Sequence, residues 1–220
     1  MSKALDRVAD AGGILHVLLV FGGYVFLVAP VMPESLDSPD AALAHVQAHP
    51  PTAAFWAGIW LEGAGLLALV LLAARVAARI RSAGPGWWLP ASAVGVAVAA
   101  VTVKVGSFAP GLAALEVDRF DAGTVTALLS INDAAVPVAA ALDGTFVLLL
   151  GLGASAVRAL PRWLATATVV AGLGQLLSVA VPALDSLQLL FLVWLLAISG
   201  WLLLRGSRAV GADAQPALAG

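Results

Sequence analysis

Three ionisable residues lie inside otherwise apolar segments, and they are the positions best suited to chemistry. Glu62 and Asp143 each precede a glycine, in LEGAGLLALVLLAARV from Leu61 and LDGTFVLLLGLGASAV from Leu142, and Lys104 lies in a third apolar segment. A charged group at the middle of a bilayer costs about 2.5 to 3.5 kcal/mol, so such groups face the protein interior or a wet cavity. The sequence therefore predicts a cluster of two acids and one base.

This cluster suggests proton transfer. One ammonium neutralises one carboxylate, so the second carboxyl is expected to hold a proton at neutral pH, which it can give to a substrate or pass along a transport path. Glu62 and Asp143 are therefore the candidate catalytic acid and base. Lys104 is expected to adjust the proton affinity of these carboxyl groups or to stabilise an oxyanion. The alternative is that Lys104 pairs with one acid and the cluster only fixes the register of the helices.

Further polar and aromatic residues could line a cavity around the cluster, and most of them are expected in the outer half of the bilayer. The candidate substrate-binding residues are Tyr24, Trp60, Asn132, Asp133, Gln175, Ser178, Gln188 and Trp194. The alternative for each polar residue is an interhelical hydrogen bond worth about 0.6 kcal/mol.

Composition places these residues in a membrane protein. Of 220 residues, 61% are hydrophobic and 11% are charged, against about half and a quarter in soluble domains. A hydrocarbon core of about 30 Å needs roughly 20 apolar residues per helix. The expected fold is an all-α polytopic bundle of about six transmembrane helices, forming one domain over 1–205 with a flexible cytoplasmic tail over 206–220. The predicted spans are 12–32, 53–74, 87–108, 134–157, 163–181 and 187–204.

The distribution of charge predicts the topology. Nine of the eleven basic residues lie at the N-terminus, in the loops after the second and fourth spans, and at the C-terminus. They are Lys3, Arg7, Arg75, Arg79, Arg81, Arg158, Arg162, Arg205 and Arg208. The opposite loops carry Glu34, Asp37, Asp40, Glu116, Asp118, Asp121 and Asp185. The positive-inside rule then places both termini in the cytoplasm.

Local signals predict details at the membrane surfaces. Ser38-Pro39-Asp40 is typical of a helix start, so a short outer helix is expected over 41–48. The segment 121–130 is expected to extend the fourth span outward. Tryptophans are predicted to form interfacial belts, with Trp56 at the outer side and Trp87, Trp88, Trp163 and Trp201 at the inner side.

Several classes of function are disfavoured. The absence of cysteine excludes disulfides, iron–sulfur clusters and thiolate nucleophiles. A net charge of −2 argues against a nucleic-acid partner. His45 and His49 have the spacing of metal ligands, but the glutamate of the HExxH motif is missing. A single histidine within a span, His16, does not predict a haem site. Lys104 lies on the third span, whereas a retinal-binding lysine is expected on the last helix. We therefore expect no metal and no cofactor.

The segment ALPRWLA at 159–165 follows a glycine-rich helix and opens the next span. It resembles a helix boundary in a bacterial family of small multi-span integral membrane proteins that carry a domain of unknown function. Glu62 and the start Arg7 with Gly12-Gly13-Ile14-Leu15 also resemble the N-terminal half of that family, so the resemblance extends over about 7–205. It implies a location in the bacterial inner membrane and implies no activity.

The leading functional hypothesis is an intramembrane isomerase or cyclase that transfers protons on a lipophilic small molecule, with the lipid bilayer as its other partner. The first alternative is a proton-coupled transporter or permeation subunit. Since six spans are few for a monomeric transporter, that alternative favours a homodimer. The second is a non-catalytic accessory protein whose buried polar groups only specify packing.

Overall fold

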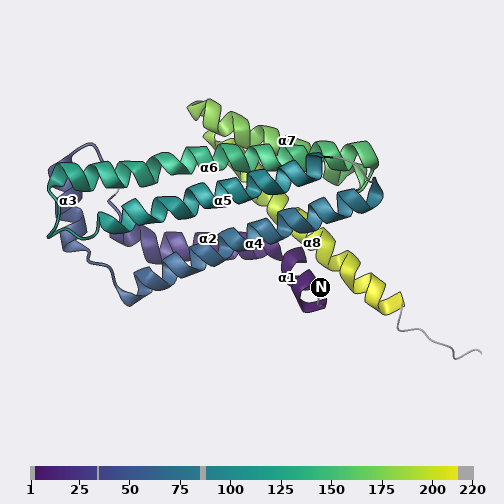
Figure 1. Ribbon diagram of the computed structural model, residues 1–220, viewed down its shortest axis with the longest axis horizontal. Helices are drawn as coiled ribbons and strands as arrows, with labels where there is room; N and C mark the ends of the chain where they lie inside the picture. Colours follow the sequence, from purple (N-terminus) through teal and green to yellow (C-terminus); the bar gives the residue numbers. More distant parts are fainter. Residues whose placement is uncertain (1–2, 34, 85–87, 213–220) are drawn as a thin grey trace, which may run out of the picture.

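The computed structural model describes residues 3–33, 35–84 and 88–212, and the described chain is all helical (Figure 1). Six helical segments are long and apolar enough to cross a membrane, which confirms the predicted polytopic bundle. The α-helices are α1 Lys3–Asp10, α2 Gly12–Gly23, α3 Pro39–Ala48, α4 Ala53–Ala83, α5 Leu89–Ala113, α6 Ala122–Val157, α7 Arg162–Ala180 and α8 Gln188–Ala212. A π-helical turn η1 (Tyr24–Val28) and a 3₁₀ turn η2 (Ala29–Val31) complete the first span, and a 3₁₀ turn η3 (Pro182–Leu187) precedes α8.

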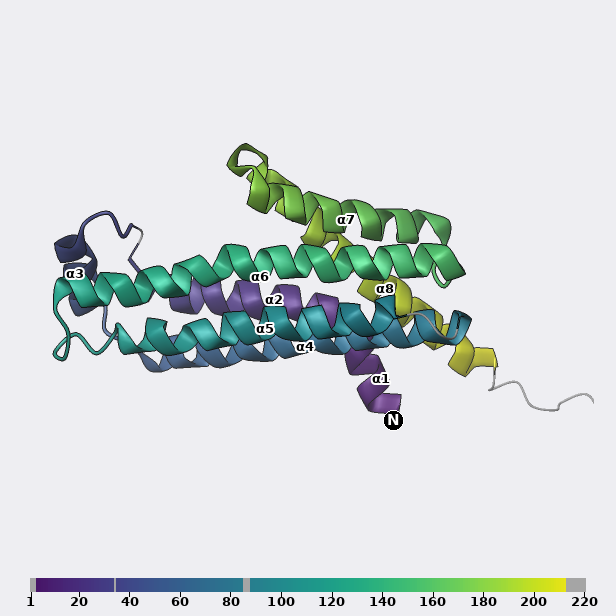
Figure 2. The same cartoon turned by 45° about the horizontal axis from the view of Figure 1, so that its top comes forward.

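The long helices α4, α5 and α6 run side by side along the bundle (Figures 1 and 2). Helix α2 packs on α4, α7 packs on the other side of α6, and α8 contacts both α2 and α7. The main core joins these layers through fully buried side chains that include Leu69, Leu72, Phe146, Leu150 and Leu195. Six helices of the bundle can therefore contribute side chains to one interior site.

Three helices are longer than their apolar segments predict. Helix α4 continues to Ala83 because Val76, Ala77 and Ile80 remain buried beyond the predicted end. Helix α6 begins at Ala122, as the predicted outward extension requires, and Asp121 caps it by accepting a hydrogen bond from the Thr124 N–H at 2.7 Å. The same bond lowers the pKa of Asp121. Helix α5 continues to Ala113. Hydropathy identifies the spans, whereas capping and packing set the helix ends.

The predicted short surface helix is α3. Its N-cap is Ser38, whose Oγ accepts a hydrogen bond from the Ala41 N–H at 3.4 Å. Val46 of α3 packs against Val125 and Leu129 of α6. We call the end with α3 and the α5–α6 connection the acidic end, since Asp37, Asp40, Glu116, Asp118 and Asp121 belong to these segments. The α4–α5 and α6–α7 connections and the last turns of α8 form the basic end, with Arg79, Arg81, Arg158, Arg162 and Arg205.

The last helix extends into the segment predicted as a tail. Helix α8 continues through 206–212, which were expected to be flexible. The remainder of the predicted tail, 213–220, lies outside the described residues, as do Glu34 of the acidic loop and Trp87 of the aromatic belt.

Helices α6 and α7 approach closely at a pair of glycines. A Cβ added at Gly172 would lie 2.6 Å from the backbone N of Leu148 and 2.9 Å from the carbonyl O of Gly144. We expect Gly172→Ala to lower the free energy of unfolding by about 1 to 3 kcal/mol through overpacking. The matched control is Gly95→Ala in α5, where an added Cβ meets nothing within 4 Å. Unfolding midpoints in detergent check this, and equal midpoints for the two variants would contradict the close approach.

Candidate functional site

A cavity of about 390 Å³ lies inside the bundle, and Glu62, Lys104 and Asp143 all line it. The other polar residues of the lining are His16, Gln175 and Gln188, and the remaining walls are apolar. Ligand pockets typically measure about 300 to 1,000 Å³ and are mostly apolar with a few placed polar groups. The three ionisable residues that the sequence predicts to cluster therefore share one space of ligand size.

Lys104 of α5 pairs with Glu62 of α4. Its Nζ lies 3.5 Å from Glu62 Oε1, and the Glu62 side chain is only 3% exposed. Lys104 Nζ also lies 5.7 Å from the centre of the Phe108 ring, one helical turn away. The sequence left open which acid would meet Lys104, and the structure selects Glu62.

Asp143 of α6 lies in the same cavity without such a counter-ion. Its Oδ1 is buried and has no hydrogen-bond partner among the residues that the structure describes. Gln175 of α7 is 5% exposed, and its Oε1 is likewise unpartnered within that part of the chain. Unpaired buried acceptors are costly unless something satisfies them. Two residues of the cavity lining therefore each carry a buried acceptor that no described residue satisfies.

His16 of α2 belongs to the site and was not predicted there. It is 6% exposed and lines the cavity, and its Nδ1 lies 3.0 Å from the carbonyl O of Gly65. A carbonyl only accepts, so Nδ1 donates, and Nε2 of the neutral imidazole is left as an acceptor. The signal in the sequence is a polar residue within an apolar span, which we consider only as a haem ligand and set aside because it is a single histidine.

The predicted substrate-binding residues at the far end of the cavity are brought together. Gln175 and Gln188 line the cavity itself. With Ser178 and Asp185, they also line a neighbouring hollow of about 380 Å³ between α6, α7 and η3. Gln175 and Gln188 therefore belong to both spaces.

Tyr24 and Asn132 lie near the ion pair. They line a narrow space of about 20 Å³ that also touches Glu62 and Lys104. Together with Asp133 they line a wider hollow of about 650 Å³, which reaches the loop after η2. A succession of hollows thus connects the acidic end to the ion pair.

Trp60 and Trp194 do not line the cavity. Trp60 is 77% exposed on α4, so its ring faces away from the cavity. Trp194 is 2% exposed in the core, where it stacks on Phe191 and its Nε1 donates to Thr168 Oγ1 at 2.9 Å. The rotation of α4 and α8 about their axes directs these rings outward and into the core respectively, which residue type alone does not reveal.

The cavity opens on an apolar part of the bundle surface. Phe21 of α2, Val136 of α6 and Leu189 of α8 line it and are 45%, 46% and 58% exposed. Residues that both line a cavity and are exposed lie at its mouth. An apolar mouth of this kind suits a molecule that arrives through the bilayer.

Among the described residues, no three His, Cys, Asp or Glu side chains lie close enough together to hold a metal ion. His49 Nδ1 instead bonds the carbonyl O of His45 at 2.9 Å.

These features define a multi-pass helical membrane protein with an interior cavity lined by Glu62, Lys104, Asp143 and His16. No protein-family model, curated protein or solved structure matches the chain. Membership of the family that the ALPRWLA segment resembles therefore stays a prediction, and the function must be argued from the cavity.

Proposed function

We propose that this protein is an intramembrane enzyme that isomerises or cyclises a lipophilic small molecule by proton transfer. The observation that carries the proposal is the unpartnered Asp143 carboxyl, in the same cavity as the Glu62–Lys104 ion pair. General acid–base catalysis needs a donor and an acceptor within reach of one bound molecule. A shared cavity with two differently surrounded carboxyl groups meets that requirement.

The two carboxyl groups take different roles in this proposal. Lys104 favours the carboxylate form of Glu62, which makes Glu62 the proton acceptor. Asp143 has no neighbouring cation in the described structure, so it is the group that carries and donates a proton. The ammonium of Lys104 can also stabilise negative charge that develops on a substrate oxygen.

The cavity walls indicate the kind of substrate. Gln175 Oε1 and His16 Nε2 can accept hydrogen bonds from a hydroxyl or amine, while the apolar walls contact a hydrocarbon body. The mouth at Phe21, Val136 and Leu189 admits such a molecule from the bilayer. As part of the same proposal, the protein resides in a bacterial inner membrane with both termini in the cytoplasm.

Chromatography of a lipid extract tests the enzymatic proposal. The purified protein in nanodiscs is incubated with a total bacterial lipid extract, which is then separated by chromatography with mass detection. Isomerisation and cyclisation conserve mass, so we expect one component to decline while a product of equal mass appears at a new retention time. Empty nanodiscs control for spontaneous conversion. A protein-containing sample identical to that control would contradict the proposal.

A proton-coupled transporter is the second candidate. The succession of hollows lined by Asp133, Asn132 and Tyr24 favours it, because these hollows follow one another from the acidic end to Glu62. A homodimer would supply the second half of a path. Proteoliposomes with a pH gradient and a pH-sensitive dye test this candidate. Protein-dependent collapse of the gradient that Tyr24→Phe slows would favour transport, whereas a stable gradient would exclude it.

A further inference from the structure

We propose that the basic end holds the phosphate of an anionic phospholipid between Arg79 of α4 and Arg205 of α8. This site is separate from the cavity and does not depend on the proposed reaction. Both guanidinium groups are arranged around the ring of Trp201, the Cζ of Arg79 at 4.6 Å and that of Arg205 at 4.9 Å from its centre.

The contact with Trp201 restrains both arginine side chains near one ring. A guanidinium over an indole ring is held by the ring quadrupole, and its N–H groups remain available at its edges. Arg79 uses one of them, since its Nε donates to the carbonyl O of Ala159 at 3.4 Å. The other N–H groups of Arg79 and Arg205 donate no hydrogen bond to a residue that the structure describes, and arginine is suited to bidentate phosphate binding.

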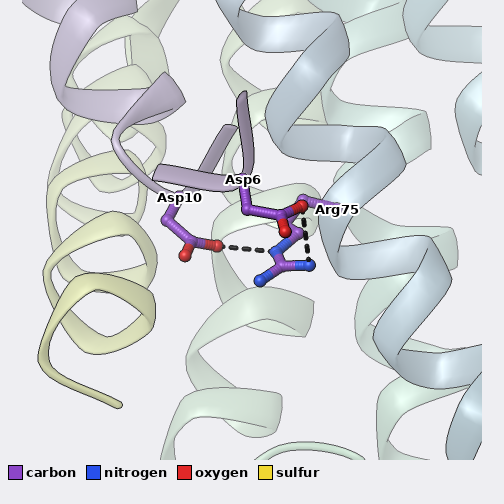
Figure 3. A network of polar contacts seen from close by, with 3 residues as sticks. All are labelled: Asp6, Asp10 and Arg75. Atoms are coloured by element: carbon purple, nitrogen blue, oxygen red, sulfur yellow. Dashed lines mark hydrogen bonds and ion pairs between the residues drawn. The ribbon is translucent and has the colours of Figure 1, made fainter. Parts of the chain in front are cut away.

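The neighbouring ion-pair network leaves one positive charge uncompensated. Arg75 of α4 binds Asp10 at 2.7 Å and Asp6 at 3.4 Å, both from α1, and Figure 3 shows the two carboxylates converging on its guanidinium. In the described chain, no carboxylate lies within 4.0 Å of Arg79 or Arg205. Three guanidinium groups therefore face two carboxylates, and one phosphodiester would neutralise the group.

The site lies where lipid phosphates are found. Arg79 is about 23 residues, or roughly 35 Å, along α4 from Trp56, the 45% exposed tryptophan predicted for the outer belt, so α4 spans the hydrocarbon core of about 30 Å between them. Trp88 and Trp163, 69% and 60% exposed, lie at the same end as Arg79 and extend the interfacial belt. A phosphate bound here is therefore in the plane of the headgroups, which favours a lipid over a soluble anion.

Helix α1 adds an apolar surface beside the site. Leu5 and Val8 are 41% and 43% exposed, on the face of α1 opposite Asp6 and Asp10. The network with Arg75 holds α1 against α4, while this exposed face is suited to contact with acyl chains. The surface thus fits both parts of a phospholipid.

Native mass spectrometry of the whole protein in detergent tests the site, with phosphatidylglycerol and phosphatidylcholine titrated in parallel. We expect phosphatidylglycerol to bind about tenfold more tightly, and the double variant Arg79→Gln, Arg205→Gln to lose this preference. Arg81→Gln is the matched control, because Arg81 is an exposed residue of the same helix outside the site. An unchanged preference in the double variant, or no preference in the wild type, would overturn the proposal.

Two further experiments control for misfolding of the double variant and for binding of a soluble anion in place of a lipid. If the double variant does not fold, as judged by circular dichroism, Arg205→Gln alone replaces it, since Arg205 is exposed, and a wild-type preference in that variant would overturn the site. Millimolar inorganic phosphate is added against chloride of equal ionic strength. If phosphate displaces the lipid and chloride does not, the ligand is a soluble anion and the lipid assignment is overturned. If both salts have equal effects on lipid binding, the lipid assignment is supported.

Discussion

Lys104→Met is expected to lower the free energy of unfolding by about 3 to 5 kcal/mol. The substitution removes the counter-ion of Glu62, which is 3% exposed, and an isolated buried charge is far more costly than a paired one. The double variant Lys104→Met, Glu62→Met removes both charges and is expected to recover most of the loss, because apolar residues of similar volume replace buried ion pairs without large cost. Unfolding in mixed micelles measures both changes.

A matched substitution separates this effect from a general effect of methionine. Lys3→Met in the exposed part of α1 is expected to change the free energy of unfolding by less than about 0.5 kcal/mol. Equal unfolding free energies for Lys104→Met and Lys3→Met would show that the ion pair does not hold Glu62 in the folded protein.

Asp143→Asn is expected to reduce the rate of substrate conversion by about 10² to 10⁴, the usual contribution of a general acid or base. The amide keeps the size of the carboxyl but cannot exchange a proton. The folded structure should tolerate the change, since Asp143 Oδ1 has no hydrogen-bond partner among the described residues. The initial rate of isomer formation in nanodiscs is the measurement.

Asp118→Asn is the control for this substitution, because Asp118 is exposed in the α5–α6 connection far along the chain from the cavity. Its rate should equal that of the wild type. A wild-type rate in Asp143→Asn would remove Asp143 from the reaction and leave the buried charges with a packing role alone.

Much of the fold was predictable because membrane helices have strong local signals. Long apolar runs gave all six spans, Ser38-Pro39-Asp40 gave α3, and the polar segment 121–130 gave the outer part of α6. Helix ends beyond the bilayer were less predictable. The continuation of α4 to Ala83 depends on the burial of Ile80 against other helices, which hydropathy does not report.

The candidate site was predictable in its charges and less so in its contacts. The free-energy cost of exposing a charged group to lipid is enough to predict that Glu62, Lys104 and Asp143 face the protein interior. The structure shows that they line one cavity. Contacts between helices decide the rest. The rotation of each helix about its axis decides which acid pairs with Lys104 and whether His16, Trp60 and Trp194 face the cavity. A sequence rich in leucine and alanine does not fix that rotation.

Incorporation of deuterium from heavy water tests proton transfer by the two carboxyl groups most directly. The lipid-extract reaction is run in heavy water, and the isomeric product is examined by mass spectrometry. Because Glu62 accepts one proton while Asp143 donates another that exchanges with solvent, we expect the product to gain one carbon-bound deuterium, and Asp143→Asn to suppress it. A product formed at the normal rate without deuterium would contradict proton transfer between two separate groups.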